Sequence, residues 1–141
     1  MPRSSSGVAM QRSLKRLLIV NDQYEFVLRL SWISERLGFA TRILRHNLDL
    51  GHVMQFWRPD FVAIQMEMPD LQEVEVLNYL EEIAFLGSIL LTGNVPPRKL
   101  AEAADVARLH GLSVTGTLVI HSNDGEIEAA LRLLSGLERA A

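Results

Sequence analysis

Five short apolar runs alternate with segments of helical spacing, and this alternation constrains the fold more than any other feature. The runs cover residues 17–20, 39–44, 61–64, 88–91 and 114–120. Nearly continuous hydrophobicity over so few residues is typical of parallel strands that are buried on both faces. Residues 25–37 carry apolar side chains at steps of three and four and end at Gly38, which predicts a helix. Similar spacing predicts further helices over residues 48–57 and 71–85, between Pro97 and His110, and after an N-cap at Asn123-Asp124.

Strict alternation of strand and helix predicts an α/β, doubly wound domain with a five-stranded parallel sheet, because right-handed crossovers place helices on both faces. The default strand order for such a domain of this size is 2-1-3-4-5, the flavodoxin-like arrangement. Sites in these folds lie at the carboxyl ends of the strands. Functional residues are therefore sought where the first, third, fourth and fifth strands end.

The chain of 141 residues has the size of a single domain. We expect a disordered leader over residues 1–14, a folded domain over 15–137 and a tail over 138–141. The net charge is -3 and no dense Lys/Arg cluster occurs, which argues against nucleic acid as a partner. No apolar run approaches the roughly 20 residues of a membrane span. The absence of cysteine fits a cytoplasmic protein and excludes thiolate metal sites.

The motifs at the predicted strand ends resemble a known family. Residues 18–22 are similar to the acidic-pair motif of response-regulator receiver domains, and residues 59–64 are similar to the strand that leads to their phospho-acceptor. Residues 68–70 match the usual continuation of that strand, and residues 91–93 match the segment with the switch threonine. The resemblance covers nearly everything but the leader, and it implies the receiver fold.

The resemblance also implies that two charges are missing from the phosphorylation site. The position of the family's phospho-acceptor aspartate is Gln65 here, and the first member of the acidic pair is Asn21. An amide has no negative charge and is a poor nucleophile toward phosphorus, so an acyl phosphate does not form at Gln65. Asp22 alone remains for Mg²⁺, which prefers several anionic oxygen ligands. We expect no cofactor and no metal site, with Mg²⁺ binding weak or absent.

A third position of the family's site departs from the pattern as well. The lysine that contacts the phosphoryl oxygens falls on Ile120, or on His121 if the alignment shifts by one residue. Thr92 keeps the family's hydroxyl residue, and Glu67 lies on the loop that follows the third strand. No catalytic residue is expected. The degenerate phosphorylation site comprises Asn21, Asp22, Gln65, Glu67, Thr92, Ile120 and His121.

The sequence thus predicts a pseudo-receiver in a bacterial two-component or phosphorelay pathway, which acts by binding partners independently of phosphorylation. One alternative is a working receiver that is phosphorylated at Asp70, Glu67 or Asp22. Another is the regulatory domain of a cyclic-di-GMP phosphodiesterase, because residues 107–116 are similar to receivers found ahead of EAL-type domains. No glycine-rich phosphate loop or nucleophile elbow occurs, so we expect no enzyme activity of its own.

The partner surface is predicted on the fourth helix, the fifth strand and the fifth helix, through which receivers commonly dimerise. Val106 and Leu109 fall off the apolar face of the fourth helix, and with Leu118 they are the interface candidates. The alternative is that Val106 and Leu109 contact the last helix or a loop. Trp32 and Trp57 are expected to be packing residues. The expected partner is a histidine kinase, an output domain, a phosphodiesterase or a second copy of the chain.

Overall fold

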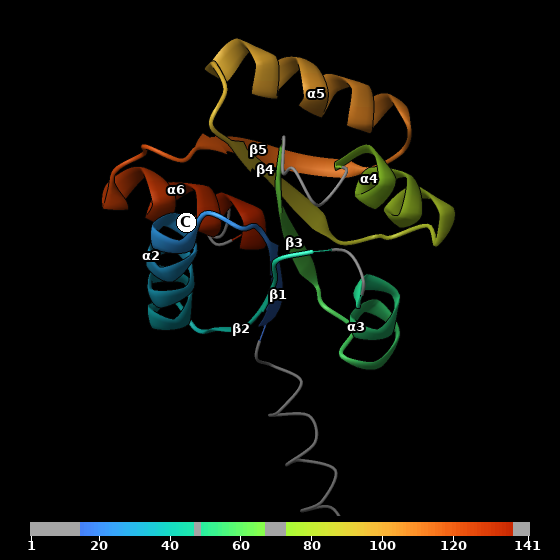
Figure 1. Cartoon of the computed structure of the whole chain (residues 1–141), viewed down its shortest axis with the longest axis horizontal. Coiled ribbons are helices and arrows are strands. Elements are labelled where there is room, and N and C mark those ends of the chain that lie inside the picture. The colour runs from blue at the N-terminus through green and yellow to red at the C-terminus, as the bar shows by residue number, and fades with distance from the viewer. Residues whose placement is uncertain (1–14, 47–48, 67–72, 137–141) are drawn as a thin grey trace, which may run out of the picture.

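Five strands and five helices make up the described part of the computed structural model, which comprises residues 15–46, 49–66 and 73–136 (Figure 1). The strands are β1 (Lys15–Val20), β2 (Phe39–Leu44), β3 (Phe61–Gln65), β4 (Ser88–Gly93) and β5 (Ser113–Val119). The helices are α2 (Tyr24–Arg36), α3 (Leu50–Phe56), α4 (Glu73–Glu82), α5 (Pro97–Leu109) and α6 (Asp124–Ser135). Outside the described residues lie the predicted leader and tail, Glu67 and Asp70.

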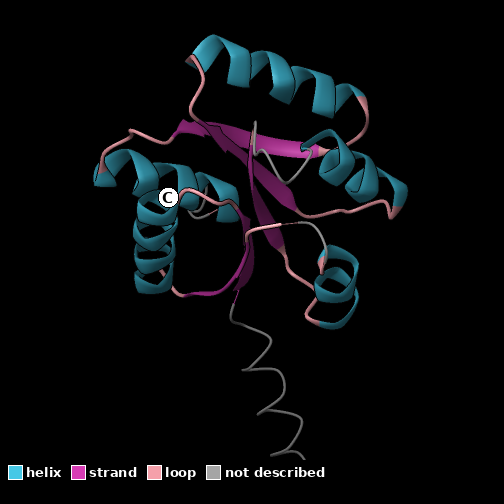
Figure 2. Ribbon diagram, viewed as in Figure 1, coloured by secondary structure: helices cyan, strands magenta, loops and turns pink. Residues whose placement is uncertain are grey.

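All five strands are parallel and form one sheet in the order β2-β1-β3-β4-β5, which confirms the predicted topology (Figure 2). The register pairs Val20 of β1 with Ile64 of β3, and Gln65 of β3 with Thr92 of β4. Because the strands run in the same direction, their carboxyl ends meet at one edge of the sheet. The strand order reverses between β1 and β3, and this is the point at which such folds place their sites.

The sheet separates two hydrophobic layers, because successive side chains of a strand point to opposite faces. Leu18 and Val20 of β1 belong to the layer under α3, α4 and α5, and Leu17 and Ile19 to the layer under α2 and α6. Figure 1 shows the two groups of helices on opposite sides of the sheet. Burial of each such side chain contributes roughly 1.5–3 kcal/mol. Within the described ranges no helix has the length and apolar character needed to cross a membrane.

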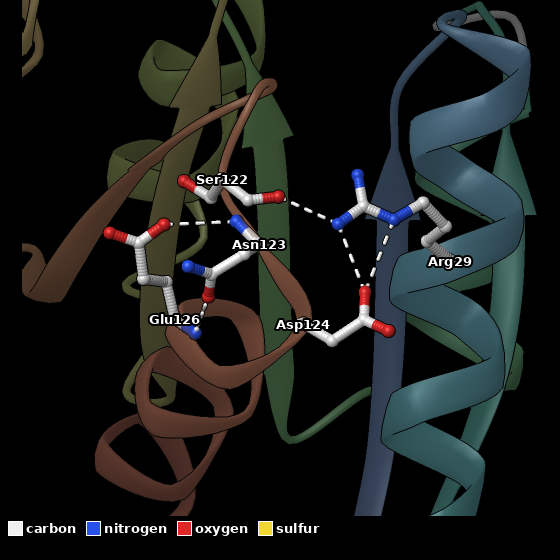
Figure 3. A network of polar contacts seen from close by, with 5 residues as sticks. All are labelled: Arg29, Ser122, Asn123, Asp124 and Glu126. Atoms are coloured by element: carbon white, nitrogen blue, oxygen red, sulfur yellow. Dashed lines mark hydrogen bonds and ion pairs between the residues drawn. The ribbon is translucent and has the colours of Figure 1, made fainter.

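The start of α6 confirms the predicted N-cap. The Asn123 side chain accepts a hydrogen bond from the Glu126 backbone N–H at 2.8 Å, and the Glu126 carboxylate accepts one from the Asn123 N–H at 2.9 Å (Figure 3). This reciprocal arrangement is a capping box, which satisfies two backbone donors at the helix start. The helix ends at Gly136, whose φ of 81° is accessible to glycine without strain.

The α4 helix differs from the prediction in its end and in its buried side. The predicted helix ran to residue 85, whereas α4 ends at Glu82. Val76 and Leu80 are buried, but Ile83, which stands at helical spacing to Leu80, is exposed beyond the helix end. Two sets of apolar residues in this segment fit one side of a helix. Leu77, Leu80 and Ile83 are three positions apart, and Val76 and Leu80 are four positions apart. Contact with the sheet selects the phase of Val76 and Leu80.

Candidate functional site

The polar residues predicted at the strand ends meet at the centre of the carboxyl edge. Asn21 directly follows β1, Gln65 is the last residue of β3, and Thr92 lies in β4 beside Gln65. All three side chains are buried. A buried polar group destabilises the fold unless it is hydrogen-bonded, so the partners of these side chains decide what the site can do. We call Asn21, Asp22, Gln65 and Thr92 the amide cluster.

Asn21 and Thr92 form a continuous chain of hydrogen bonds across the central strands. The Asn21 Nδ2 donates to the Thr92 Oγ1 at 3.3 Å, and the Thr92 hydroxyl donates to the Ile64 carbonyl at 3.2 Å. The Asn21 Oδ1 accepts from the backbone N–H of Gln23, the N-cap residue of α2, at 2.7 Å. A hydroxyl group has one proton. Because Thr92 uses that proton inside the domain, it has none to offer to a bound anion in this arrangement.

Gln65 joins the end of β3 to the loop between β1 and α2. Its Oε1 accepts a hydrogen bond from the backbone N–H of Asp22 at 2.7 Å. A carboxylate in the place of Gln65 could accept the same bond, but it would bring a second negative charge next to Asp22. Two neighbouring carboxylates disfavour each other's ionised form. The amide satisfies the backbone donor without that repulsion.

Asp22 is the carboxylic acid of the amide cluster. The residue is half-buried, and its Oδ1 is buried without a hydrogen bond to any described residue. The side-chain oxygens of Asn21 and Gln65 already accept backbone N–H groups. In the described part of the chain, no three or more His, Asp or Glu side chains are arranged to hold a metal ion. One carboxylate and two engaged amides do not fit the several oxygen ligands of a divalent cation.

The end of β5 supplies no ammonium group to the amide cluster. Ile120 is half-buried against the layer of α2 and α6, and its backbone N–H donates to the Gly93 carbonyl at 3.0 Å. His121 is exposed and lines a shallow hollow with residues at the start of α2, among them Gln23 and Phe26. The two positions considered for the family's lysine therefore lie beside the site as an apolar packing residue and an exposed imidazole.

Arg29 was not singled out from the sequence, yet it fastens α2 to the loop after β5 (Figure 3). Its Nη2 donates to the Ser122 carbonyl at 2.6 Å and to the Asp124 carboxylate at 3.0 Å. Its Nε donates to the same Asp124 oxygen at 3.3 Å. Arg29 and Asp124 are 95 positions apart in the sequence, so no local pattern indicates this contact.

The predicted interface residues do not share one surface. Val106 and Leu109 of α5 are exposed, as predicted, and Val106 lines a groove between α4 and α5 together with Leu77. Leu118 was wrong as an interface candidate, because it is buried in the layer of α2 and α6. An apolar residue of a strand contributes to the core when helices cover the face of the sheet to which it points.

The two tryptophans have different environments, although both were expected to be packing residues. Trp57 is half-buried and packs against the layer of α3, α4 and α5. Trp32 is exposed on the outer side of α2, while Leu30 and Ile33 of the same helix are buried. The expectation was therefore wrong for Trp32, since α2 turns its other apolar side toward the sheet.

Comparison with known proteins identifies the fold. No family model and no curated protein matches the sequence. The chain is similar to the signal receiver domain of an HD domain-containing protein from Pseudomonas fluorescens Pf-5, with 18% identity and a TM-score of 0.72 over 91% of this chain and 99% of that one. It is similar to a CheY-like response regulator receiver domain protein from Methanospirillum hungatei JF-1, with 16% identity and a TM-score of 0.70 over 91% and 99%.

A further similar structure is a response regulator protein from Burkholderia pseudomallei with a phosphorylated aspartic acid, a calcium ion and citrate. The identity is 18% and the TM-score 0.66, over 90% of this chain and 73% of that one. Together with the strand order, these neighbours define the class of the protein: the chain has the receiver fold of response regulators. At such low identity the similarity establishes the fold, and the chemistry has to be argued from the residues of the site.

Proposed function

We propose that this chain is a signalling domain that regulates partner proteins by binding them, without being phosphorylated itself. The observation that carries the proposal is the amide cluster, in which Asn21 and Gln65 stand at the ends of β1 and β3 and are both hydrogen-bonded within the domain. In the receiver fold, these strand ends are where phosphorylation chemistry is expected. An amide side chain is a poor nucleophile toward phosphorus, so this domain's signal has another origin.

Weak or absent Mg²⁺ binding is part of the same proposal. Mg²⁺ demands nearly octahedral oxygen ligands and keeps its own waters unless anionic ligands compensate for their loss. Asp22 offers one carboxylate, and the neighbouring amides offer no charge. We expect no cofactor and no enzyme activity of the domain's own. The degenerate site then serves as a structural joint between β1, β3 and β4.

A second candidate function is favoured by one observation, the Asp22 Oδ1 that is buried without a donor. Such an oxygen retains the capacity to bind a proton, a cation or a phosphoryl group. A working receiver would then accept the phosphoryl group at Asp22, or at Glu67 or Asp70, which lie outside the described residues. The product would be an acyl phosphate, whose cleavage by hydroxylamine distinguishes it from a phosphate ester.

The partner in this proposal is another signalling protein, namely a histidine kinase, an output domain or a phosphodiesterase. The Pseudomonas neighbour is the receiver domain of an HD domain-containing protein, an example of this fold within a larger chain. A homodimer through α5, β5 and α6 is the alternative, with the exposed Val106 and Leu109 of α5 as contacts. We expect a cytoplasmic location and no nucleic-acid partner, consistent with the net charge of -3.

The test is an amide NMR titration with Mg²⁺ followed by beryllofluoride, which mimics a bound phosphoryl group. The matched control is Asn21→Asp/Gln65→Asp, which restores both carboxylates in the same scaffold. We expect the amides of Asp22, Gln65 and Thr92 to stay unmoved in the natural sequence at millimolar Mg²⁺, and to shift saturably in the double variant. Saturable shifts in the natural sequence would overturn the proposal and favour the second candidate.

A further inference from the structure

The outer side of α2 carries three large hydrophobic side chains that remain at least half exposed. Tyr24, Leu28 and Trp32 follow one another at intervals of four and are exposed at 59%, 50% and 59%. Residues four apart lie on the same side of a helix. The opposite side of α2, which includes Phe26 and Leu30, is buried against the sheet and α6. The helix is therefore apolar on two sides, and the fold uses only one of them.

The edge strand β2 extends this apolar surface. The Thr41 hydroxyl donates to the Glu35 carboxylate of α2 at 2.8 Å, and the Arg45 guanidinium lies 5.4 Å from the centre of the Tyr24 ring. Ile43 lies between Thr41 and Arg45, and alternate residues of a strand point to the same face. Ile43 is exposed and thus lies alongside the outer side of α2. We call Tyr24, Leu28, Trp32 and Ile43 the α2–β2 surface.

Two arginines lie at the ends of the α2–β2 surface, and each places its guanidinium over an aromatic ring. The Arg36 guanidinium lies 4.8 Å from the centre of the Trp32 ring, as Arg45 lies over Tyr24. Neither forms an ion pair with another residue of the described ranges. A cation over an aromatic ring is held in place while its charge stays available to a partner. By contrast, a described carboxylate pairs with each of Arg29, Arg98, Arg108 and Arg132.

We propose that the α2–β2 surface binds an acidic amphipathic helix of a partner protein. Tyr24 and Trp32 are eight residues apart, which is about 12 Å along a helix. Two carboxylates seven positions apart on a partner helix are about 10.5 Å apart, within reach of both guanidinium groups. Apolar residues between those carboxylates then cover Leu28 and Ile43. Tyr, Trp and Arg are also the residue types enriched at binding hot spots.

Charge disfavours the other occupants of this surface. A symmetric contact between two copies would bring Arg36 and Arg45 of one copy close to the same arginines of the other, and like charges across an interface repel. An anionic membrane would attract the arginines, but its phosphates are not confined to defined positions and would also meet the exposed Glu25 and Glu35 of the same helix. A protein helix can carry its carboxylates over the two arginines and apolar residues beside Glu25 and Glu35, so that like charges stay apart. The inference rests on the proposed function only in that a binding module needs a partner.

The test is an NMR titration with two synthetic helical peptides of about 16 residues, long enough to form a helix. The acidic peptide carries two glutamates seven positions apart with leucines between them on one side, and the basic peptide has lysines in place of the glutamates. The indole N–H of Trp32 is the reporter, and that of Trp57 is the internal reference. We expect saturable shifts at Trp32 with the acidic peptide, and binding at least about tenfold weaker with the basic one.

Matched charge reversals locate the binding. We expect Arg36→Glu/Arg45→Glu to weaken binding of the acidic peptide at least about tenfold. The control Arg98→Glu/Lys99→Glu makes the same change of net charge on exposed residues at the start of α5, and it should leave the affinity within about twofold. All four side chains are exposed, so a thermal unfolding curve suffices to verify that each variant is folded.

Several results would overturn this inference. They are equal binding of the two peptides, no shift of Trp32 at millimolar acidic peptide, or equal effects of the two charge reversals. A dimer that Leu28→Glu abolishes would assign the surface to a second copy, and binding of anionic vesicles would assign it to a membrane. If neither the acidic peptide nor Mg²⁺ shifts the amides, the inference about the α2–β2 surface is wrong and the proposed function stands. If Mg²⁺ shifts them saturably, the proposed function is wrong whatever the peptides do.

Discussion

The amide cluster and the α2–β2 surface are separated by only a few residues of chain, and they invert the usual relation between polarity and burial. Asn21 and Gln65 are polar and buried, whereas Tyr24 and Trp32 are large aromatic residues and exposed. The buried polar groups find partners inside the domain, but the exposed aromatic rings are left to solvent. The difference shows that the polar side chains at the end of the sheet are used for hydrogen bonds within the domain. The surface that remains exposed for recognition is apolar and cationic.

The largest expected effect comes from breaking the amide cluster at Asn21. Asn21→Ala removes the bonds to Thr92 and to the Gln23 N–H, and we expect it to lower the free energy of unfolding by about 2 kcal/mol. Urea unfolding measures this loss. The control Asn94→Ala changes an exposed asparagine and should stay within about 0.5 kcal/mol. A loss no larger than that of the control would mean that the cluster contributes no stability.

A smaller effect is expected at the other end of the same hydrogen-bonded chain. Thr92→Val keeps the shape of the side chain but removes its bonds to Asn21 and to the Ile64 carbonyl, for a loss of about 1–1.5 kcal/mol. A double-mutant cycle with Asn21→Ala should give a coupling energy of about 0.5–1 kcal/mol. Simple additivity of the two losses would contradict a bond between these side chains in solution.

The contacts of Arg29 with Ser122 and Asp124, which we call the Arg29 clamp, join α2 to the loop after β5. Arg29→Lys keeps the charge but loses the fork that donates to both Ser122 and Asp124, so we expect a loss of about 1 kcal/mol. Since 38% of this side chain is exposed, salt should reduce the loss. Arg36→Lys on the same helix is the control. If Arg29→Lys and Arg36→Lys have equal free energies of unfolding, the contacts of Arg29 contribute no more stability than an ordinary surface residue.

The smallest effect on stability is expected where the α2–β2 surface is altered. Trp32→Ala should change the free energy of unfolding by less than about 0.5 kcal/mol, because the residue is 59% exposed and the Arg36 guanidinium over its ring is exposed as well. Thermal unfolding measures this change, and Trp57→Ala, at the half-buried tryptophan, is the matched comparison. A loss at Trp32 as large as that at Trp57 would mean that the α2–β2 surface is covered within the domain.

Much of the fold and of the candidate site could be predicted, because both depend on local patterns. The apolar runs predicted the strands, the default order for doubly wound domains of this size was confirmed, and the pair Asn123-Asp124 was recognised as an N-cap from its type and position. The expectations failed where a residue had two plausible environments. Leu118 and Trp32 are both large and apolar, and only the side of the element that faces the sheet decides that one is buried and the other exposed.

By itself, the sequence determined the alternation of strands and helices and the positions of the amides at the strand ends, because periodicity and residue type are local properties. The receiver fold was implied by the resemblance of the strand-end motifs to that family. Tertiary structure alone decided the partners of those amides, the Arg29 clamp and the exposure of Tyr24, Leu28 and Trp32. These features join residues as far as 95 positions apart, or depend on which of two apolar sides a helix turns inward. Such choices are made by packing against the whole sheet, because a short segment with two apolar sides has no preference of its own.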